Sequence, residues 1–319
     1  MSAPQHAWSC ARIVSSRYRT LLGHLLLAVG STAGFVLLIE LAAKVAGLPL
    51  GAPLLPDSRN CLQRSSLLSM EFRPHCHGAL SSTAFDTNDL GLRSPEVRVD
   101  GSRRILAIGD SCTWGWAVPQ DGSYPAVLQR LLDQRSDGTR YQVINAGTPG
   151  YTSYHGLQYL RERGLALHPF ILILGYGFND ATTDGDVEEQ LAAERRLLPV
   201  MLVDDFLFLH SRAYAFARRH SMAARRDPRQ RVDPARFGQH LEEMITLARA
   251  DGVHTMALSF SATQQGPYGE ALASVATQLA IPVVTYQGPR FDVVHPTAEG
   301  YGALAALILE RLEHEGWVE

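Results

Sequence analysis

The chain has 319 residues, of which 46% are hydrophobic and 19% charged, so it can form one large folded domain with further segments. Its formal net charge of −3 at pH 7 argues against a basic nucleic-acid-binding protein, and no nucleic-acid partner is expected. Its four cysteines are too few for a disulfide scaffold.

An apolar segment, TLLGHLLLAVGSTAGFVLLI, occupies residues 20–39, with His24 as its only ionisable residue. About 20 such residues span the core of a bilayer as a helix. Arginines precede the segment, and basic residues are sparse after it: Arg12, Arg17 and Arg19 lie before it, and Lys44 and then Arg59 follow. The positive-inside rule therefore predicts a cytoplasmic N-terminus at 1–19, a transmembrane anchor at 20–47 and the remaining chain in the periplasm.

Two other interpretations of this segment are open. A cleaved signal peptide usually has an apolar region of only about 7–15 residues, followed by small residues. This segment is longer, and the charged residues Glu40 and Lys44 follow it. A buried helix of a soluble domain is the second alternative. We expect a retained, single-pass anchor.

After the apolar segment, the pattern of secondary structure becomes regular from residue 103 onward. Residues 48–102 are interpreted as a linker, rich in Pro and Gly at its start, and an N-terminal extension; STAFDTNDLGLRS within it indicates a short strand and a turn. Strands are predicted at 104–110, 140–147, 170–176, 253–260 and 281–286, and helices at 122–135, 152–165, 233–250, 269–280 and 297–315. This alternation predicts an α/β domain at 103–319, a three-layer α/β/α sandwich around five parallel strands. The irregular stretch at about 181–231 is interpreted as a partly helical cap or lid.

Glycines and polar residues follow four of these strands. Ligands of open parallel sheets bind beyond the carboxyl ends of the strands. The residues concerned are Gly109, Asp110 and Ser111; Asn145 and Gly150; Gly177, Asn179 and Asp180; and Asp292 and His295. They supply the groups that acyl transfer needs.

Each of five residues has an expected catalytic role. Ser111 supplies the nucleophilic hydroxyl, His295 the base, and Asp292 the group that orients the base. The amides of Ser111 and Gly150 and the side chain of Asn179 are expected to form the oxyanion hole.

Taken singly, these residues also have structural interpretations. Ser111 can be the N-cap of a helix, and His295 a surface histidine before a turn. Asn179 and Asp180 can cap or turn the chain, which is the role we expect for Asp180, and Gly150 can serve a turn.

At these residues the chain resembles the SGNH (GDSL-type) hydrolase family, in its membrane-anchored bacterial form. The four blocks are GDSCTWG, NAGTPGYTS, GFND and DVVH, in the family's order. The resemblance covers residue 103 to the C-terminus and implies a flavodoxin-like sheet. It also implies that the family's Ser, Gly, Asn and His are Ser111, Gly150, Asn179 and His295, with Asp292 as the acid. The G-x-S-x-G elbow of α/β-hydrolases is absent from the sequence.

The cysteines leave alternatives open. Cys112 stands where the family usually has Leu, and we expect it to be buried and inert; Cys10 is expected to be cytoplasmic and free. Cys61 and Cys76 can form a disulfide in an oxidising compartment or remain free thiols, and HCH at 75–77 can be read as metal ligands. The disulfide is the interpretation we favour, and no metal or cofactor is expected.

A basic stretch lies within the predicted insert. By default it is a solvated arm, and contact with anionic headgroups or an anionic glycan is the alternative. Its residues are Arg212, Arg218, Arg219, Arg225, Arg226, Arg229 and Arg231.

Together these features predict a membrane-anchored serine esterase that acts on O-acyl esters of a small molecule, a glycan or a lipid. An O-acyltransferase with the same residues is one alternative, and a catalytically silent protein of envelope assembly is the other. The sequence does not choose the substrate or the oligomeric state.

Overall fold

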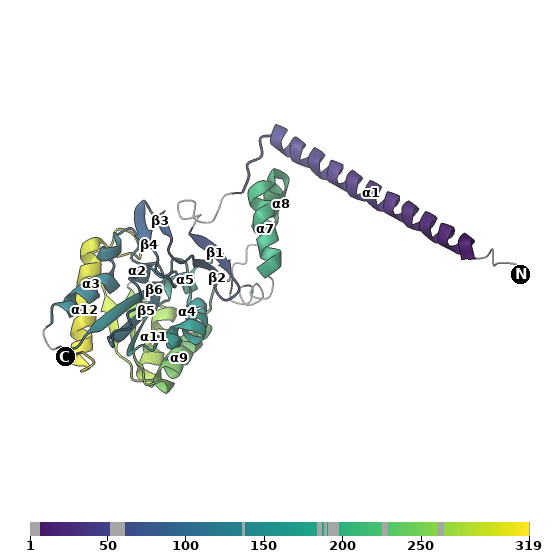
Figure 1. The fold of residues 1–319 in the computed structure, drawn as a ribbon. Coiled ribbons are helices and arrows are strands. Elements are labelled where there is room, and N and C mark those ends of the chain that lie inside the picture. The colour runs from purple at the N-terminus through teal and green to yellow at the C-terminus, as the bar shows by residue number, and fades with distance from the viewer. Residues whose placement is uncertain are drawn as a thin grey trace, which may run out of the picture. The chain divides into compact units, whose positions relative to one another are not determined.

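A computed structural model describes residues 7–51, 61–135, 138–183, 187, 190, 198–224, 229–260 and 265–318 (Figure 1). The chain divides into two compact units. One comprises Met1–Ala52 with Val203–Arg225, and the other comprises Pro53–Leu202 with Arg226–Glu319.

The larger unit is built on a five-stranded parallel sheet, as predicted. Its strands are β5 (Arg103–Gly109), β6 (Tyr141–Gly147), β7 (Ile171–Gly175), β8 (His254–Phe260) and β9 (Val283–Tyr286), in the order β6-β5-β7-β8-β9. This is the flavodoxin-like 2-1-3-4-5 order. Its switch point lies between β5 and β7, and the segments that follow β5, β6 and β7 meet at the carboxyl edge of the sheet.

Helices cover both faces of this sheet, which confirms the three-layer prediction (Figure 1). Alternate residues of β5 enter different cores: Leu106 and Ile108 pack with one set of helices, and Ile105 and Ala107 with the other. The first set is α4 (Ser153–Tyr159), α9 (Pro234–Ala250) and α11 (Pro267–Gln278), and the second is α3 (Tyr124–Asp133) and α12 (Ala298–His314). Apolar side chains on both strand faces make this burial possible.

Short helical segments occupy several connections. The helix α2 (Ser111–Trp114) follows β5, and α5 (Phe178–Ala181) follows β7. The helix predicted at 152–165 is divided: α4 ends at Tyr159, a π-helical turn spans Leu160–Gly164, and a 3₁₀ turn follows at Leu165–Leu167. A further 3₁₀ turn lies at Gln120–Gly122.

The N-terminal extension is more ordered than its sequence indicates. It forms two antiparallel hairpins, β1 (Leu62–Ser65) with β2 (Ser69–Phe72), and β3 (His77–Leu80) with β4 (Thr83–Asp86). Phe72 stacks on Trp114 with ring centroids 4.5 Å apart, and Phe85 meets Trp114 edge-on at 5.0 Å. The extension therefore packs directly against α2.

The smaller unit contains α1 (Ala7–Val45), α8 (Arg212–Ala224) and most of α7 (Leu198–His210). Residues Leu21–Val45 form a helix long and apolar enough to cross a membrane. The helical content predicted for the insert is present in α7 and α8, which group with α1 from Val203 onward. The rest of the predicted cap, including Arg225 and Arg226, lies mainly outside the described residues, as does the side chain of Cys10.

Candidate active site

Ser111 lies at the carboxyl end of β5, where the chain turns sharply into α2. The turn needs glycine at Gly109, because a Cβ there would lie 2.1 Å from Thr113 Oγ1 and 2.7 Å from the carbonyl oxygen of Gly175. The N-cap of α2 is Asp110, whose Oδ1 accepts a hydrogen bond from the Cys112 amide at 2.9 Å. The interpretation of Ser111 as the cap is therefore wrong, and its hydroxyl is left for another partner.

That partner is His295, which continues a hydrogen-bonded line to a carboxylate. Ser111 Oγ lies 2.7 Å from His295 Nε2, and His295 Nδ1 lies 2.6 Å from Asp292 Oδ2. Asp292 Oδ1 accepts from the amides of Val294 and His295, both at 2.8 Å. These contacts fix the carboxylate, so it holds the proton on Nδ1 and leaves Nε2 as the acceptor toward Ser111.

The hydrogen bonds also keep Asp292 ionised. Partial burial alone would raise the pKa of Asp292, but the His295 amide, the His295 ring and the Val294 amide outweigh that effect. The pKa of Asp292 therefore lies below its ordinary value.

Two aromatic side chains lie against the imidazole. The ring of Trp116 is nearly parallel to that of His295, with centroids 5.3 Å apart and planes inclined by 20°. The ring of Phe291 lies 5.8 Å away at 17°. Phe291 is half-exposed, so this part of the site offers an apolar surface to a bound molecule.

Gly150 lies in a tight turn after β6, at the same edge of the sheet. The amide of Tyr151 donates to the carbonyl of Thr148 at 3.2 Å, and Gly150 has a φ of +83°, which favours glycine. Apart from its two chain neighbours, no atom of the described residues lies within 4 Å of a Cβ built at Gly150. Within the described chain neither the Gly150 amide nor the Ser111 amide donates a hydrogen bond, so both are free for a bound oxygen.

Asn179 connects this turn to the end of β7. Its Nδ2 donates to the carbonyl of Tyr151 at 3.0 Å and lies 3.5 Å from Asp110 Oδ2. The structure thus brings Ser111, Asp292 and His295 into one line, and ties the Asn179 side chain to the turn that contains Gly150.

A buried network behind these donors was not foreseen. Asp180, expected to be a turn residue, is fully buried, and its Oδ1 accepts from the Ser153 amide at 2.9 Å and the Ser153 hydroxyl at 2.5 Å. Its Oδ2 accepts from the Gly177 amide at 3.1 Å, and His240 Nδ1 lies 2.9 Å from Ser153 Oγ. Asp180 therefore joins the segment after Gly150 to the segment that carries Asn179.

Burial changes the acidity of both aspartates near the site. Desolvation raises the pKa of Asp110 to about 7, and the nearby charge of Asp180 adds to this rise. Burial likewise raises the pKa of Asp180, although its hydrogen bonds from Ser153 oppose the rise.

Arg93 is a second residue that sequence reasoning missed. It comes from the extension, is buried, and donates to the carbonyls of Trp114 (2.9 Å), Gly115 (2.7 Å) and Val118 (2.7 Å). Its guanidinium also lies over the Trp114 ring, 5.3 Å from the centroid. Arg93 thus holds the turn that follows α2. The sequence gives no hint of this role, because Arg93 lies in a segment with little predicted secondary structure.

The cysteines have distinct environments. Cys61 and Cys76 are joined by a disulfide, which removes Cys76 as a thiolate ligand from the HCH sequence at 75–77. His77 is paired instead with Asp86. Cys112 is buried, and burial raises the pKa of its thiol, as expected for an inert cysteine.

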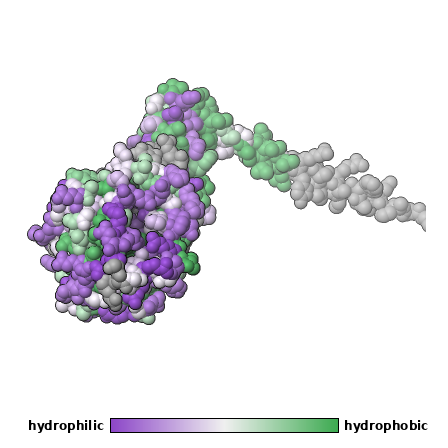
Figure 2. Space-filling view, turned by 60° about the vertical axis from the view of Figure 1, so that its left-hand side comes forward, coloured by the Kyte–Doolittle hydropathy of each residue, from purple (hydrophilic) through white to green (hydrophobic). Residues whose placement is uncertain are grey.

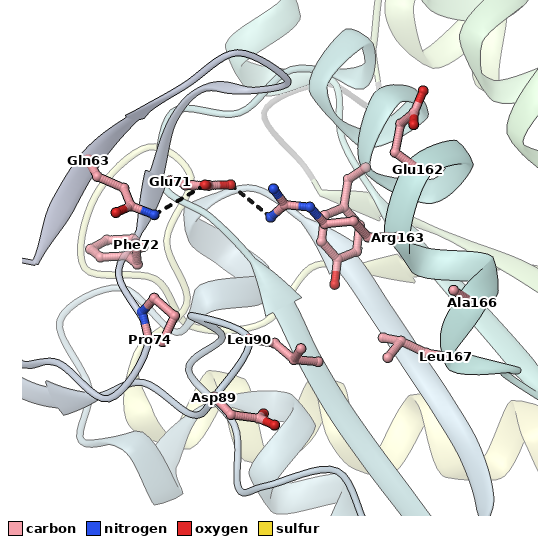
Figure 3. A pocket seen from close by; sticks show the side chains of 11 residues that line it. Gln63, Glu71, Phe72, Pro74, Asp89, Leu90, Glu162, Arg163, Ala166 and Leu167 are labelled. Atoms are coloured by element: carbon pink, nitrogen blue, oxygen red, sulfur yellow. Dashed lines mark hydrogen bonds and ion pairs between the residues drawn. The ribbon is translucent and has the colours of Figure 1, made fainter. Parts of the chain in front are cut away.

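A cavity of about 450 Å³ lies apart from the catalytic line (Figure 3). The ion pair between Glu71 and Arg163 crosses it at 2.8 Å, and Gln63 donates to Glu71 at 3.2 Å. Neither Ser111 nor His295 lines it. Its polar contacts hold the extension against the π-helical turn.

Comparisons with known proteins identify the family of the chain. Residues 107–303 match the model of the GDSL-like lipase/acylhydrolase family. Similar solved structures include TesA (21% identity, 66% of this chain and 98% of that one, TM-score 0.46) and a lipase/acylhydrolase from Enterococcus faecalis (20%, 67% and 96%, 0.44). Another is a variant of Axe2, an acetyl-xylooligosaccharide esterase from Geobacillus Stearmophilus (18%, 66% and 95%, 0.46). A comparison with curated proteins gives no significant match. Because the family model covers more than half of the sequence, the chain belongs to the GDSL-like lipase/acylhydrolase family and is an ester hydrolase.

Proposed function

We propose that the chain is a membrane-tethered serine esterase in which Ser111, His295 and Asp292 form the catalytic triad. One observation carries this proposal: the hydrogen-bonded line from Asp292 through His295 to Ser111, with contacts of 2.6 and 2.7 Å. A serine hydroxyl is a weak nucleophile until a neighbouring base accepts its proton, and this geometry supplies that base.

The proposed reaction has two halves. Ser111 Oγ attacks the ester carbonyl while His295 Nε2 takes its proton, and the negative oxygen of the tetrahedral intermediate accepts hydrogen bonds from the Ser111 and Gly150 amides and from Asn179 Nδ2. His295 then gives its proton to the leaving alcohol, which leaves an acyl-enzyme. Water attacks the acyl carbon while His295 Nε2 takes one of its protons, and His295 then gives this proton to Ser111 Oγ as the bond to the acyl carbon breaks and the acid leaves. Asp292 stabilises the imidazolium in both halves.

The substrate class is an O-acyl ester of a small molecule, a glycan or a lipid. The apolar surface of Trp116 and Phe291 beside His295 supports an ester with an apolar part close to its carbonyl. Membership of a hydrolase family favours water over a sugar hydroxyl as the acyl acceptor, and it disfavours a silent scaffold. The triad chemistry uses no metal or cofactor.

The tether is the span Leu21–Val45, with the hydrolase unit outside the cytoplasm. The arginines before the span support this orientation. The disulfide between Cys61 and Cys76 also supports it, because disulfides persist in oxidising compartments. Protease added to spheroplasts should digest the hydrolase unit, and an alkaline phosphatase fused after Glu319 should be active. An inactive fusion with a protected domain would mean that the orientation is reversed.

A serine-reactive fluorophosphonate tests the nucleophile. Wild-type protein should become labelled, and Ser111→Ala should lose both the label and the hydrolysis of a short p-nitrophenyl ester. Loss of a triad serine typically costs on the order of 10⁶ in kcat. The matched control is Ser274→Ala, which removes an exposed hydroxyl on α11 and should leave labelling unchanged. Wild-type-like turnover by Ser111→Ala would exclude the proposed triad.

A further inference from the structure

The hairpin of α7 and α8 exposes large apolar side chains to its surroundings. Val203, Phe206 and Leu209 follow each other at three-residue spacing on α7, and Phe216 lies on α8. Between 36% and 60% of each is exposed. Green hydrophobic surface is visible on this hairpin and along the described side chains of α1 in Figure 2. A water-exposed surface helix normally carries polar residues at such positions.

Three polar side chains connect the two helices of the hairpin. Asp204 on α7 accepts from the Tyr214 hydroxyl at 2.5 Å and pairs with Arg218 at 2.7 Å, both on α8. The Arg218 guanidinium also lies over the ring of Phe208, 4.4 Å from its centroid. These contacts fix how α7 and α8 pack.

The hairpin is bound to the C-terminal end of the apolar helix α1. Glu40 of α1 accepts hydrogen bonds from the start of α8: the amide of Arg212 at 2.8 Å and the hydroxyl of Ser211 at 2.8 Å. Arg212 in turn donates to the carbonyl of Leu48 at 2.6 Å. The Gly51 amide donates to the carbonyl of Phe208 at 2.9 Å. Both sides of the hairpin are therefore held to the chain that leaves the span.

The position of Glu40 places these contacts at a definite depth. A helix rises about 1.5 Å per residue, so about 20 residues cover a hydrocarbon core about 30 Å thick. A stretch of about that length from Leu21 ends at Glu40, the first acidic residue after the apolar segment. Glu40 and the start of α8 then lie where the acyl chains meet the headgroups.

We propose that the α7–α8 hairpin lies in the membrane interface and inserts Val203, Phe206, Leu209 and Phe216 among the lipids beside α1. This inference rests on the proposed tether, because α1 must be in the membrane for the hairpin to meet lipid. Lipid is the favoured occupant of the apolar face because the face belongs to the same unit as the span and is fixed to its end. The hairpin makes the tether a two-point attachment instead of a single flexible stalk.

Fluorescence quenching in vesicles tests the proposal. The full-length chain with Cys10→Ser carries one added cysteine, labelled with nitrobenzoxadiazole, and is placed in phosphatidylcholine vesicles containing shallow or deep doxyl lipids. Four variants are compared: Phe206→Cys and Phe216→Cys in the hairpin, Leu27→Cys in the span, and Leu307→Cys on α12 as the matched exposed apolar control. Retained ester hydrolysis shows that each labelled protein is folded.

Labels at 206 and 216 should be blue-shifted and quenched more by the shallow than by the deep lipid, and the label at 307 should not be quenched. A label at 27 that is not quenched would refute the tether itself. Quenching at 27 without quenching at 206 and 216 would refute only the hairpin's insertion. A blue shift at 206 without quenching would mean that a second copy of the chain covers the face, which also overturns the proposal.

Discussion

Replacing Arg93 by Met tests whether the extension supports the nucleophile. The guanidinium makes three buried hydrogen bonds to the carbonyls of Trp114, Gly115 and Val118. Hydrogen bonds to a charged group are each worth about 1.5–3 kcal/mol. Desolvation opposes this gain. It lowers the pKa of Arg93 to about 10, which corresponds to a destabilisation of the buried, charged guanidinium by about 3 kcal/mol. Arg93→Met should therefore reduce the free energy of unfolding by about 2–6 kcal/mol.

The activity of the same variant should also fall. The three carbonyls belong to the turn that follows Ser111 and carries Trp116, so their release shifts groups beside His295. We expect at least about a tenfold loss of kcat on a p-nitrophenyl ester, since small misplacements of reacting groups are costly. Arg93→Lys should recover little, because one ammonium does not reproduce the planar fork of donors.

Urea unfolding followed by tryptophan fluorescence gives the stability, and steady-state hydrolysis gives kcat. Arg98→Met is the matched control, since Arg98 is an exposed arginine of the same segment, and it should change stability by less than about 0.5 kcal/mol. If Arg93→Met were as stable and as active as Arg98→Met, the extension would not support the nucleophile.

Four further outcomes are expected. Asn179→Ala should lower kcat by roughly 10²–10³ with little loss of stability, as for removal of an oxyanion donor; a change confined to KM would make Asn179 a substrate-binding residue. Asp180→Ala should lower both kcat and stability, because Ser153 and Gly177 lose a shared buried acceptor; unchanged kcat at full folding would exclude a positioning role. Cys61 and Cys76 should remain unmodified when membrane-derived protein is alkylated without reductant and measured by mass spectrometry, whereas alkylation of both would refute the disulfide. His155 is a buried residue of α4 whose ring accepts a hydrogen bond from the Thr152 amide. Burial lowers the pKa of His155 to about 3, below its unfolded value of about 6.5, so its contribution to stability is full above pH 6.5 and decreases as the pH falls toward 3. In urea titrations, His155→Gln should make the free energy of unfolding depend less on pH below pH 6.5. The same dependence on pH as in the wild type would contradict the lowered pKa of His155.

The sheet and its helices could be predicted because burial on both faces demands long apolar runs. Ile171–Gly175 is wholly buried, and such a strand between two helical patterns has few other interpretations. The four-residue strands β1 to β4 carry no comparable signal. Only one residue in each is buried, and those of β2, β3 and β4 lie in one cluster with Trp114, a residue distant in the sequence.

The candidate site also has parts that could be predicted from the sequence and parts that could not. Ser111, His295, Asn179 and Asp292 could be proposed as site residues because their chemistry restricts the residue type, and because each follows a predicted strand or lies near the end of one. The sequence could not show whether Ser111 or Asp110 caps α2, since both residue types are good caps. That choice depends on where the carboxylate of Asp110 points, which is set by packing.

The supporting residues are harder to predict because they act on backbone atoms. Arg93 binds three carbonyl oxygens, and Asp180 accepts from two amides, so neither partner leaves a trace in the sequence. The same holds for Glu40, whose partners at the start of α8 are two amides and a serine hydroxyl some 170 residues away. In each case one charged side chain links two segments that are distant in sequence: the extension to the nucleophile turn, the glycine turn to the asparagine turn, and the span to the hairpin. Such contacts cannot be inferred from charge pairs in the sequence, because Glu40 has Lys44 four residues later and Arg93 has Glu96 three residues later, yet both side chains bind groups of other segments.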